Sequence, residues 1–109
     1  VIILKESNPN NILKQVDNLK KKNFFCISLS EQGENLDSKS FSNFFFNNGK
    51  KIAFIMGDVS GHPATLTKKT DFDLSLSKMT MPHEMATLVL IEQIYRAFSI
   101  RKGSKYHRN

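Results

Sequence analysis

Apolar residues follow two spacings along the chain. Ile12, Val16 and Leu19 recur every three or four positions, which predicts a short amphipathic helix over residues 11–22. Other segments are rich in aromatic and β-branched residues over a few consecutive positions, which predicts strands. These segments are 23–29, 41–46 and 51–56. The polar stretch 30–40 between the first two is expected to be a loop.

The two apolar runs 41–46 and 51–56 are separated by a short turn sequence, Asn47-Asn48-Gly49-Lys50. Asn-Gly supplies the positive φ values that tight hairpin turns need. We therefore expect an antiparallel hairpin, with 52–56 as a central strand.

Helical spacing returns in the last third of the chain. Pro82 suits a first helical turn, and Glu84 suits the positive end of a helix dipole. Apolar residues then recur at steps of three and four up to Phe98, so a helix is predicted from Pro82 to about Arg101. The region 64–77 before it has a weaker helical pattern, interrupted by β-branched residues.

Composition limits the class of protein. The chain has 109 residues, of which 39% are hydrophobic, enough for one small domain with a modest core. The only cysteine, Cys26, excludes an internal disulfide and indicates a reducing, cytoplasmic compartment. No apolar run is long enough to span a membrane. The net charge of +6 lies largely in 20–22 and 101–108, which we interpret as solvated helix ends, with nucleic-acid binding a weaker alternative.

One candidate site stands at the end of the predicted central strand. Asp58 follows that strand and lies between Gly57 and Gly61, in the hexapeptide GDVSGH. A carboxylate among small residues suits a hard divalent cation, and an aspartate that caps the next turn or helix is the alternative interpretation. Ser60 and His62 lack an acidic partner for hydrolase chemistry, and no catalytic residue is assigned.

Four segments together resemble one known family: GDVSGH at 57–62, PATL at 63–66, MPHEMA at 81–86 and the segment 92–98. They are similar to the SpoIIE/RsbU branch of the PPM-type, metal-dependent serine/threonine protein phosphatases. The resemblance implies that Asp58 and the Val59 carbonyl bind Mn²⁺ or Mg²⁺. It also implies hydrolysis of a phosphoprotein of the anti-sigma-factor-antagonist type.

The sequence departs from that family in ways that predict inactivity. Ser40 and Asn43 stand where acidic residues are expected, although Glu34 or Asp37 are alternatives if the loop is displaced. Pro63 follows the motif directly, and nothing after Ile100 resembles the family's later metal-binding aspartates. One carboxylate does not hold two metal ions.

The fold class expected from these features is α+β: a partial PPM-phosphatase-like β-sandwich, with an antiparallel hairpin packed against two or three helices. The expected divisions are a linker strand and helix at 1–22, a partial phosphatase-like domain at 23–101 and a basic tail at 102–109. A non-catalytic interaction module is the alternative function. Half a sandwich leaves apolar surface and strand edges exposed, so self-association is also predicted.

Overall fold

The structure, a computed structural model, describes residues 1–6, 8–47, 49–56 and 64–103. Helices and strands alternate along the chain. In order they are β1 (Ile2–Lys5), α1 (Pro9–Lys21), β2 (Phe24–Asn35), α2 (Ser38–Asn47), β3 (Lys51–Met56), α3 (Ala64–Lys69), β4 (Phe72–Ser75) and α4 (His83–Arg101). Three of the predicted elements, the helix at 11–22, the strand at 51–56 and the helix from 82, are confirmed with small shifts of their ends.

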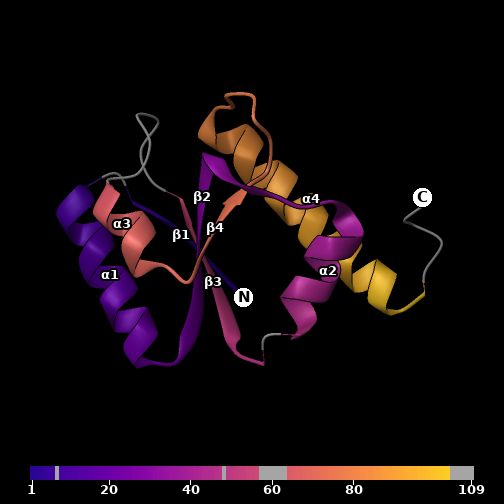
Figure 1. Cartoon of the computed structure of the whole chain (residues 1–109), viewed down its shortest axis with the longest axis horizontal. Helices are drawn as coiled ribbons and strands as arrows, with labels where there is room; N and C mark the ends of the chain where they lie inside the picture. The colour runs from indigo at the N-terminus through magenta and orange to yellow at the C-terminus, as the bar shows by residue number, and fades with distance from the viewer. Residues whose placement is uncertain (7, 48, 57–63, 104–109) are drawn as a thin grey trace.

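The four strands form one parallel sheet in the order β1-β3-β2-β4. Parallel neighbours need a crossover connection, and the helices supply it. Helices α1 and α3 cover one face of the sheet, and α2 and α4 cover the other (Figure 1). The expected α+β sandwich is therefore wrong, and the fold is an open α/β sheet between two helical layers.

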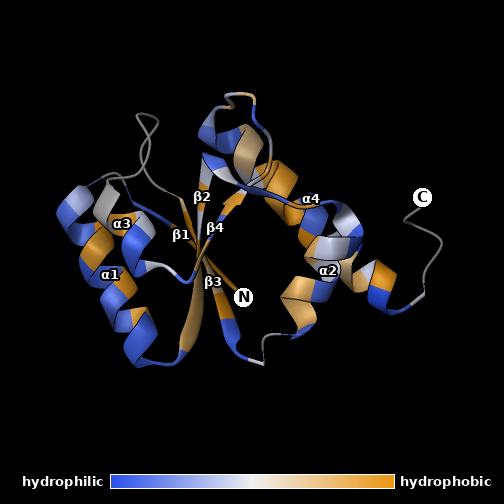
Figure 2. Cartoon of the chain, viewed as in Figure 1, coloured by the Kyte–Doolittle hydropathy of each residue, from blue (hydrophilic) through white to orange (hydrophobic). Residues whose placement is uncertain are grey.

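Each face of the sheet has its own apolar core, as the alternation of side chains along a strand requires. On β3, Ala53 and Ile55 pack against α1 and α3, whereas Ile52 and Phe54 pack against α2 and α4. Figure 2 shows the largely hydrophobic strands between the two helical layers, with α1 mostly hydrophilic and α4 carrying hydrophobic residues. Several of those on α4, including Leu88 and Ile91, are exposed. Because β3 is buried on both faces, its sequence is a continuous apolar run, which is typical of a parallel strand.

The aromatic run at 41–46 is helical, so the predicted hairpin is wrong. The Asp37 side chain accepts a hydrogen bond from the Ser40 amide at 2.8 Å, which caps the first turn of α2. Phe41 and Phe45 then lie one turn apart and are both buried against the sheet. Gly49 has the expected positive φ of 73°, but it follows a helix and leads into a parallel strand.

Strand β2 is longer than predicted because it contains a large bulge. Its register with β4 shifts between Leu29 and Glu34, so both residues lie opposite Leu74. Gly33 lies within the bulge, where an added Cβ would stand 2.7 Å from the carbonyl oxygen of Asp73. A glycine is therefore required for the bulge to lie this close to β4.

The remaining differences concern the ends of the chain and the region after β3. The expected single helix at 64–77 is a short helix followed by the edge strand β4. The segment 1–22, expected to be a linker strand and helix, contains the strand β1, which pairs with β3, and the helix α1, which packs on the sheet. Most of the expected basic tail lies outside the described residues. Within them, no helix has the length and apolar character needed to cross a bilayer.

Candidate functional site

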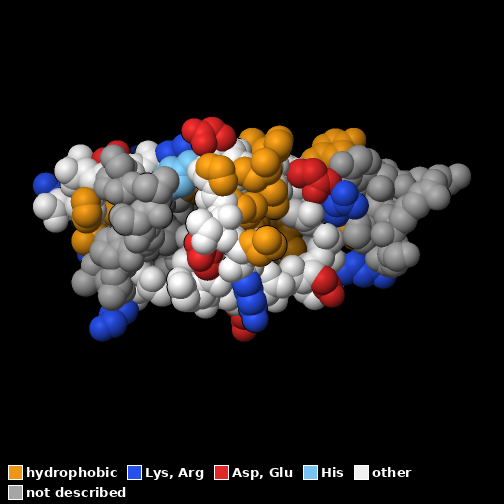
Figure 3. Space-filling model, turned by 90° about the horizontal axis from the view of Figure 1, so that it is seen from above, with side chains coloured by type: hydrophobic (Ala, Val, Ile, Leu, Met, Phe, Trp, Pro, Cys, Tyr) orange, Lys and Arg blue, Asp and Glu red, His pale blue; other side chains and the backbone are white. Residues whose placement is uncertain are grey.

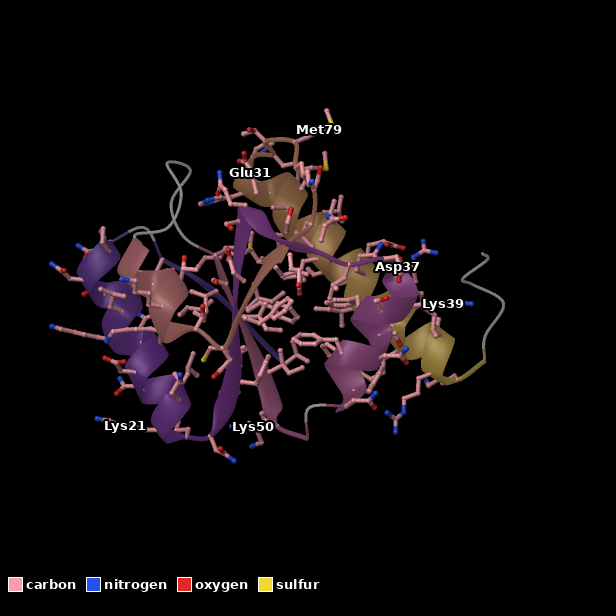
Figure 4. The ribbon with its side chains drawn as sticks, viewed as in Figure 1. Lys21, Glu31, Asp37, Lys39, Lys50 and Met79 are labelled. Atoms are coloured by element: carbon pink, nitrogen blue, oxygen red, sulfur yellow. The ribbon has the colours of Figure 1, made fainter. Side chains whose placement is uncertain are left out.

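Ligands of open parallel α/β sheets bind beyond the carboxyl ends of the strands, where the loops that follow the strands converge. In this chain the carboxyl ends of β3 and β4 lie at the same edge, together with the bulged part of β2. Glu31 and Met79 both project from this edge in Figure 4. We therefore take this edge as the place where the fold presents a site.

The connection from β4 to α4, residues 76–82, crosses this edge and is called the edge segment below. It belongs to no helix or strand, so side chains fix its shape. The Met79 amide donates to the Ser77 hydroxyl at 3.0 Å, and the Thr80 hydroxyl donates to Glu31 at 3.2 Å. The second bond ties the edge segment to the bulge of β2.

The first turns of α4 lie above the end of β3. The Thr87 hydroxyl donates to the carbonyl of His83 at 2.8 Å and also lies 3.5 Å from the sulfur of Met56. Met56 is the last residue of β3 and is buried. The amino end of α4 is thereby fixed to the carboxyl edge of the sheet.

A network of hydroxyl groups and one carboxylate joins β2 to β4 within the sheet, next to the carboxyl edge. Asp73 on β4 accepts hydrogen bonds from Ser28 at 2.8 Å and from Ser30 at 2.6 Å, both on β2. Ser28 is fully buried and also bonds the Thr70 hydroxyl at 2.9 Å. Short bonds to a carboxylate are stronger than bonds between neutral groups, so this network holds β2 and β4 in register at the start of the bulge.

Cys26 lies deeper on the same strand and is not a reactive thiol. Burial raises the pKa of the Cys26 thiol from its ordinary 9.0 to about 11, and the nearby Asp71 carboxylate adds to the rise. The thiolate is the nucleophilic form, so the protonated thiol is inert near neutral pH. Cys26 is completely buried and packs as a small core residue.

The residues proposed from the sequence as metal ligands, Asp58 and Val59, lie outside the described residues, as do Ser60 and His62. Their role stays a prediction. Ser40 and Asn43 are exposed residues of helix α2 and do not lie on a hairpin arm. Among the described residues no group of three or more His, Cys, Asp or Glu side chains is placed to hold a metal ion.

An open parallel sheet with helices on both faces defines an α/β protein of the doubly wound kind. A family model described as "Predicted SPOUT methyltransferase" matches residues 3–107. The chain belongs to this family of SPOUT methyltransferases.

Curated relatives named "Ribosomal RNA large subunit methyltransferase H" agree with this assignment. The protein from Prochlorococcus marinus subsp. pastoris is 44% identical over 108 residues, which are 98% of this chain and 75% of the relative. Another, from Synechococcus sp. strain CC9311, is 39% identical over 109 residues, 99% of this chain and 76% of the relative. A solved structure, the SpoU methyltransferase AviRb from Streptomyces viridochromogenes in complex with AdoMet, matches with a TM-score of 0.47 and 14% identity. The match covers 90% of this chain and 36% of the AviRb chain.

Membership of the methyltransferase family corrects the resemblance drawn from GDVSGH. The chain is not a PPM-type phosphatase, and a phosphoprotein substrate with Mn²⁺ or Mg²⁺ as cofactor does not belong to it. The hexapeptide and the short segments after it are too brief to define a family, whereas the methyltransferase match extends over nearly the whole chain.

The sequence pattern does not single out the edge segment. Ser77, Lys78 and Thr80 have the composition of an ordinary loop, and their importance comes from the sheet order that places the segment beside β2. An alternation of strands and helices is the signal that indicates a parallel sheet. Interpreting 41–46 as a strand removes that signal.

Proposed function

We propose that this protein transfers a methyl group from S-adenosylmethionine to RNA of the large ribosomal subunit. The observation that carries the proposal is the 44% identity, over 98% of the chain, to a relative named for that activity. The sheet edge described above is where the fold offers a site for the methyl donor. Cytoplasmic localisation follows from this proposal, because the substrate is part of the ribosome.

The residues at the carboxyl edge fit such a donor. Leu76 and Met81 are half-buried and offer apolar surface for an adenine ring. The hydroxyls of Ser77 and Thr80 and the irregular backbone of the edge segment offer hydrogen-bonding groups for the adenine and ribose. Glu31, held beside Thr80, adds a negative charge that complements a sulfonium. When bound, the donor would supply a methyl group carried on a positively charged sulfur. A nucleophilic atom of the RNA takes the methyl carbon as the carbon–sulfur bond breaks, and the sulfur leaves as the neutral thioether S-adenosylhomocysteine.

The chain's own part is to bind and orient. The bonds that join Met79 to Ser77 and Thr80 to Glu31 fix the edge segment before any ligand arrives. A preshaped segment loses less conformational freedom on binding, and this raises affinity. The anchoring of Thr87 beside Met56 holds α4 in place at the same edge.

The test measures tritium transferred from labelled S-adenosylmethionine to purified large ribosomal subunits that lack the modification. Wild-type protein is expected to label the large-subunit RNA. The double variant Ser77→Ala, Thr80→Val removes two hydrogen bonds of about 1 kcal/mol each, so its dissociation constant for S-adenosylmethionine should rise at least about tenfold. Lys39→Ala, on α2, is the matched control and should leave binding unchanged. If wild-type protein transfers no tritium to the RNA of any ribosomal particle, the proposal is overturned.

A further inference from the structure

The amino edge of the sheet, opposite the proposed methyl-donor site, carries a concentration of lysines. Lys20 and Lys21 end helix α1 and Lys22 caps it, while Lys50 precedes strand β3 and Lys51 begins it. These five residues are the amino-edge lysines. Lys51 lies opposite Phe24 in the parallel ladder, which brings the two segments together. Figure 4 shows Lys21 and Lys50 along the same lower edge, far from Glu31 and Met79.

Local structure explains how three consecutive lysines reach this edge. The Lys22 amide bonds the carbonyls of Asn18 and Leu19, which closes α1, and the last turn places Lys20 and Lys21 at the negative end of the helix dipole. Asn23 then takes a positive φ of 66° and turns the chain into β2. The lysines therefore stand at a fixed turn, and not on a free tail.

Nearby carboxylates do not neutralise this edge. Asp17 is held by Lys69 at 2.8 Å, and Asp71 lies 3.5 Å from Lys20. Lys21, Lys22 and Lys51 are exposed and enter no ion pair among the described residues. A shallow hollow beside them is lined by Asp17, Lys20, Lys21 and Lys69.

The acidic residues of the bulge and of the α4 start lie at the other edge. Strand β3 has six residues, and a strand rises about 3.3 Å per residue, so the two edges are separated by about 20 Å. That separation exceeds the screening length of about 8 Å at physiological salt. Glu31 and Glu84 therefore leave the field of the amino-edge lysines intact.

We propose that the amino-edge lysines bind the phosphate backbone of the RNA substrate, as a second contact away from the methyl-donor site. The inference rests on the proposed function, because it deepens the description of the same substrate. Exposed cations grouped at a fixed turn match phosphates spaced along a strand, and they provide affinity without reading sequence. A ribosomal RNA is large enough to reach both edges of so small a protein.

The test compares two triple variants with the same change of charge. Lys21→Gln, Lys22→Gln, Lys51→Gln removes the cations that enter no ion pair among the described residues, and Lys20 is kept because it also donates to the Lys69 carbonyl. The control carries substitutions at three exposed lysines away from the amino edge, namely Lys14→Gln, Lys39→Gln and Lys102→Gln. Affinity for purified large-subunit RNA is measured from 50 to 200 mM salt, without S-adenosylmethionine.

Each phosphate contact contributes about 0.7 to the slope of affinity against salt for a single strand, on logarithmic axes. Losing three contacts should flatten the slope by about 2, so the fourfold salt increase weakens wild-type binding roughly 20-fold more than it weakens the variant. The control variant should keep a slope close to that of wild type. Circular dichroism and S-adenosylmethionine affinity should be unchanged in both variants.

Equal slopes for wild type and the amino-edge variant would overturn the inference, as would an equal loss in the control. Stronger binding of the amino-edge region to phosphatidylserine vesicles than to RNA would assign the surface to a membrane and would also overturn it. RNA binding is scored without methyl transfer, so a failure of labelling alone refutes the proposed function and leaves this result standing. Labelling with an unchanged KM for RNA in the amino-edge variant refutes only the inference.

Discussion

Gly33→Ala is expected to weaken both the fold and the proposed methyl-donor site. The new methyl would stand 2.7 Å from the Asp73 oxygen and 2.8 Å from two backbone carbons of β4. Comfortable contact between carbon atoms begins near 3.5 Å, so bulge and strand must separate by about 0.7 Å. The obstructing atoms are all backbone, so no side chain can rotate away.

Such overpacking costs typically about 1 to 3 kcal/mol. We expect the upper half of this range, because separating the strands also stretches the bonds of Ser28 and Ser30 to Asp73. The strand β4 leads directly into the edge segment, and its displacement should move the contact between Thr80 and Glu31. Affinity for S-adenosylmethionine should therefore fall together with stability.

The assay is urea unfolding followed by circular dichroism, together with calorimetric titration of S-adenosylmethionine. Gly49→Ala is the control: Gly49 has a φ of 73° with no atom within 4 Å of an added Cβ. The free energy of unfolding of Gly49→Ala should fall by about 1 kcal/mol, the cost of a left-handed conformation for alanine, and its affinity for the ligand should not change. Wild-type stability and affinity in Gly33→Ala would refute the close approach of bulge and β4.

Two further predictions concern ionisation and assembly. Because the pKa of Cys26 is raised in the folded protein, its contribution to stability is complete below pH 9 and is lost as the pH rises toward 11; the difference in unfolding free energy between wild type and Cys26→Ala should shrink over that interval. Apolar side chains gather on the face seen in Figure 3 and along α4, where Leu88 and Ile91 are 61% and 50% exposed, so self-association, predicted from the sequence, is expected through this helix. Light scattering should show a smaller particle for Leu88→Ser, Ile91→Ser than for the control Met79→Ser, and a wild-type monomer would contradict the expectation.

The sequence predicts the elements that have an unambiguous period. The helix from Pro82 and the buried strand 51–56 are found where their patterns place them, because a nineteen-residue helix and a continuous apolar run each leave one interpretation. The run 41–46 has no such period: aromatic residues suit a strand, and Phe41 and Phe45 also lie one helical turn apart. The cap by Asp37 decides for the helix.

The candidate site is less accessible from the sequence than the elements are. Its position depends on strand order, and the sheet order places β3 between β1 and β2. No local pattern states that order. The bulge at Gly33 likewise looks like a polar loop, because its role depends on the distant strand that contains Asp73. The short motif around Asp58 points to another family because six residues constrain the fold weakly.

The strand order also governs when the sheet can form during synthesis. Strand β2 pairs with β3 and β4, which both follow it in the chain, and β1 pairs with β3, so that Ile2 lies opposite Ala53. Strands β1 and β2 do not pair with each other, because β3 lies between them in the sheet. Until residues 51–56 have left the ribosome, the described strands β1 and β2 therefore form no ladder, and α1 has only part of its docking surface. Such long-range pairing slows folding, because the chain between two paired strands must lose conformational entropy before the stabilising contacts form. The residues before 51 expose Phe24 and Phe25 during that interval, so this part of a nascent chain needs protection from aggregation until β3 arrives.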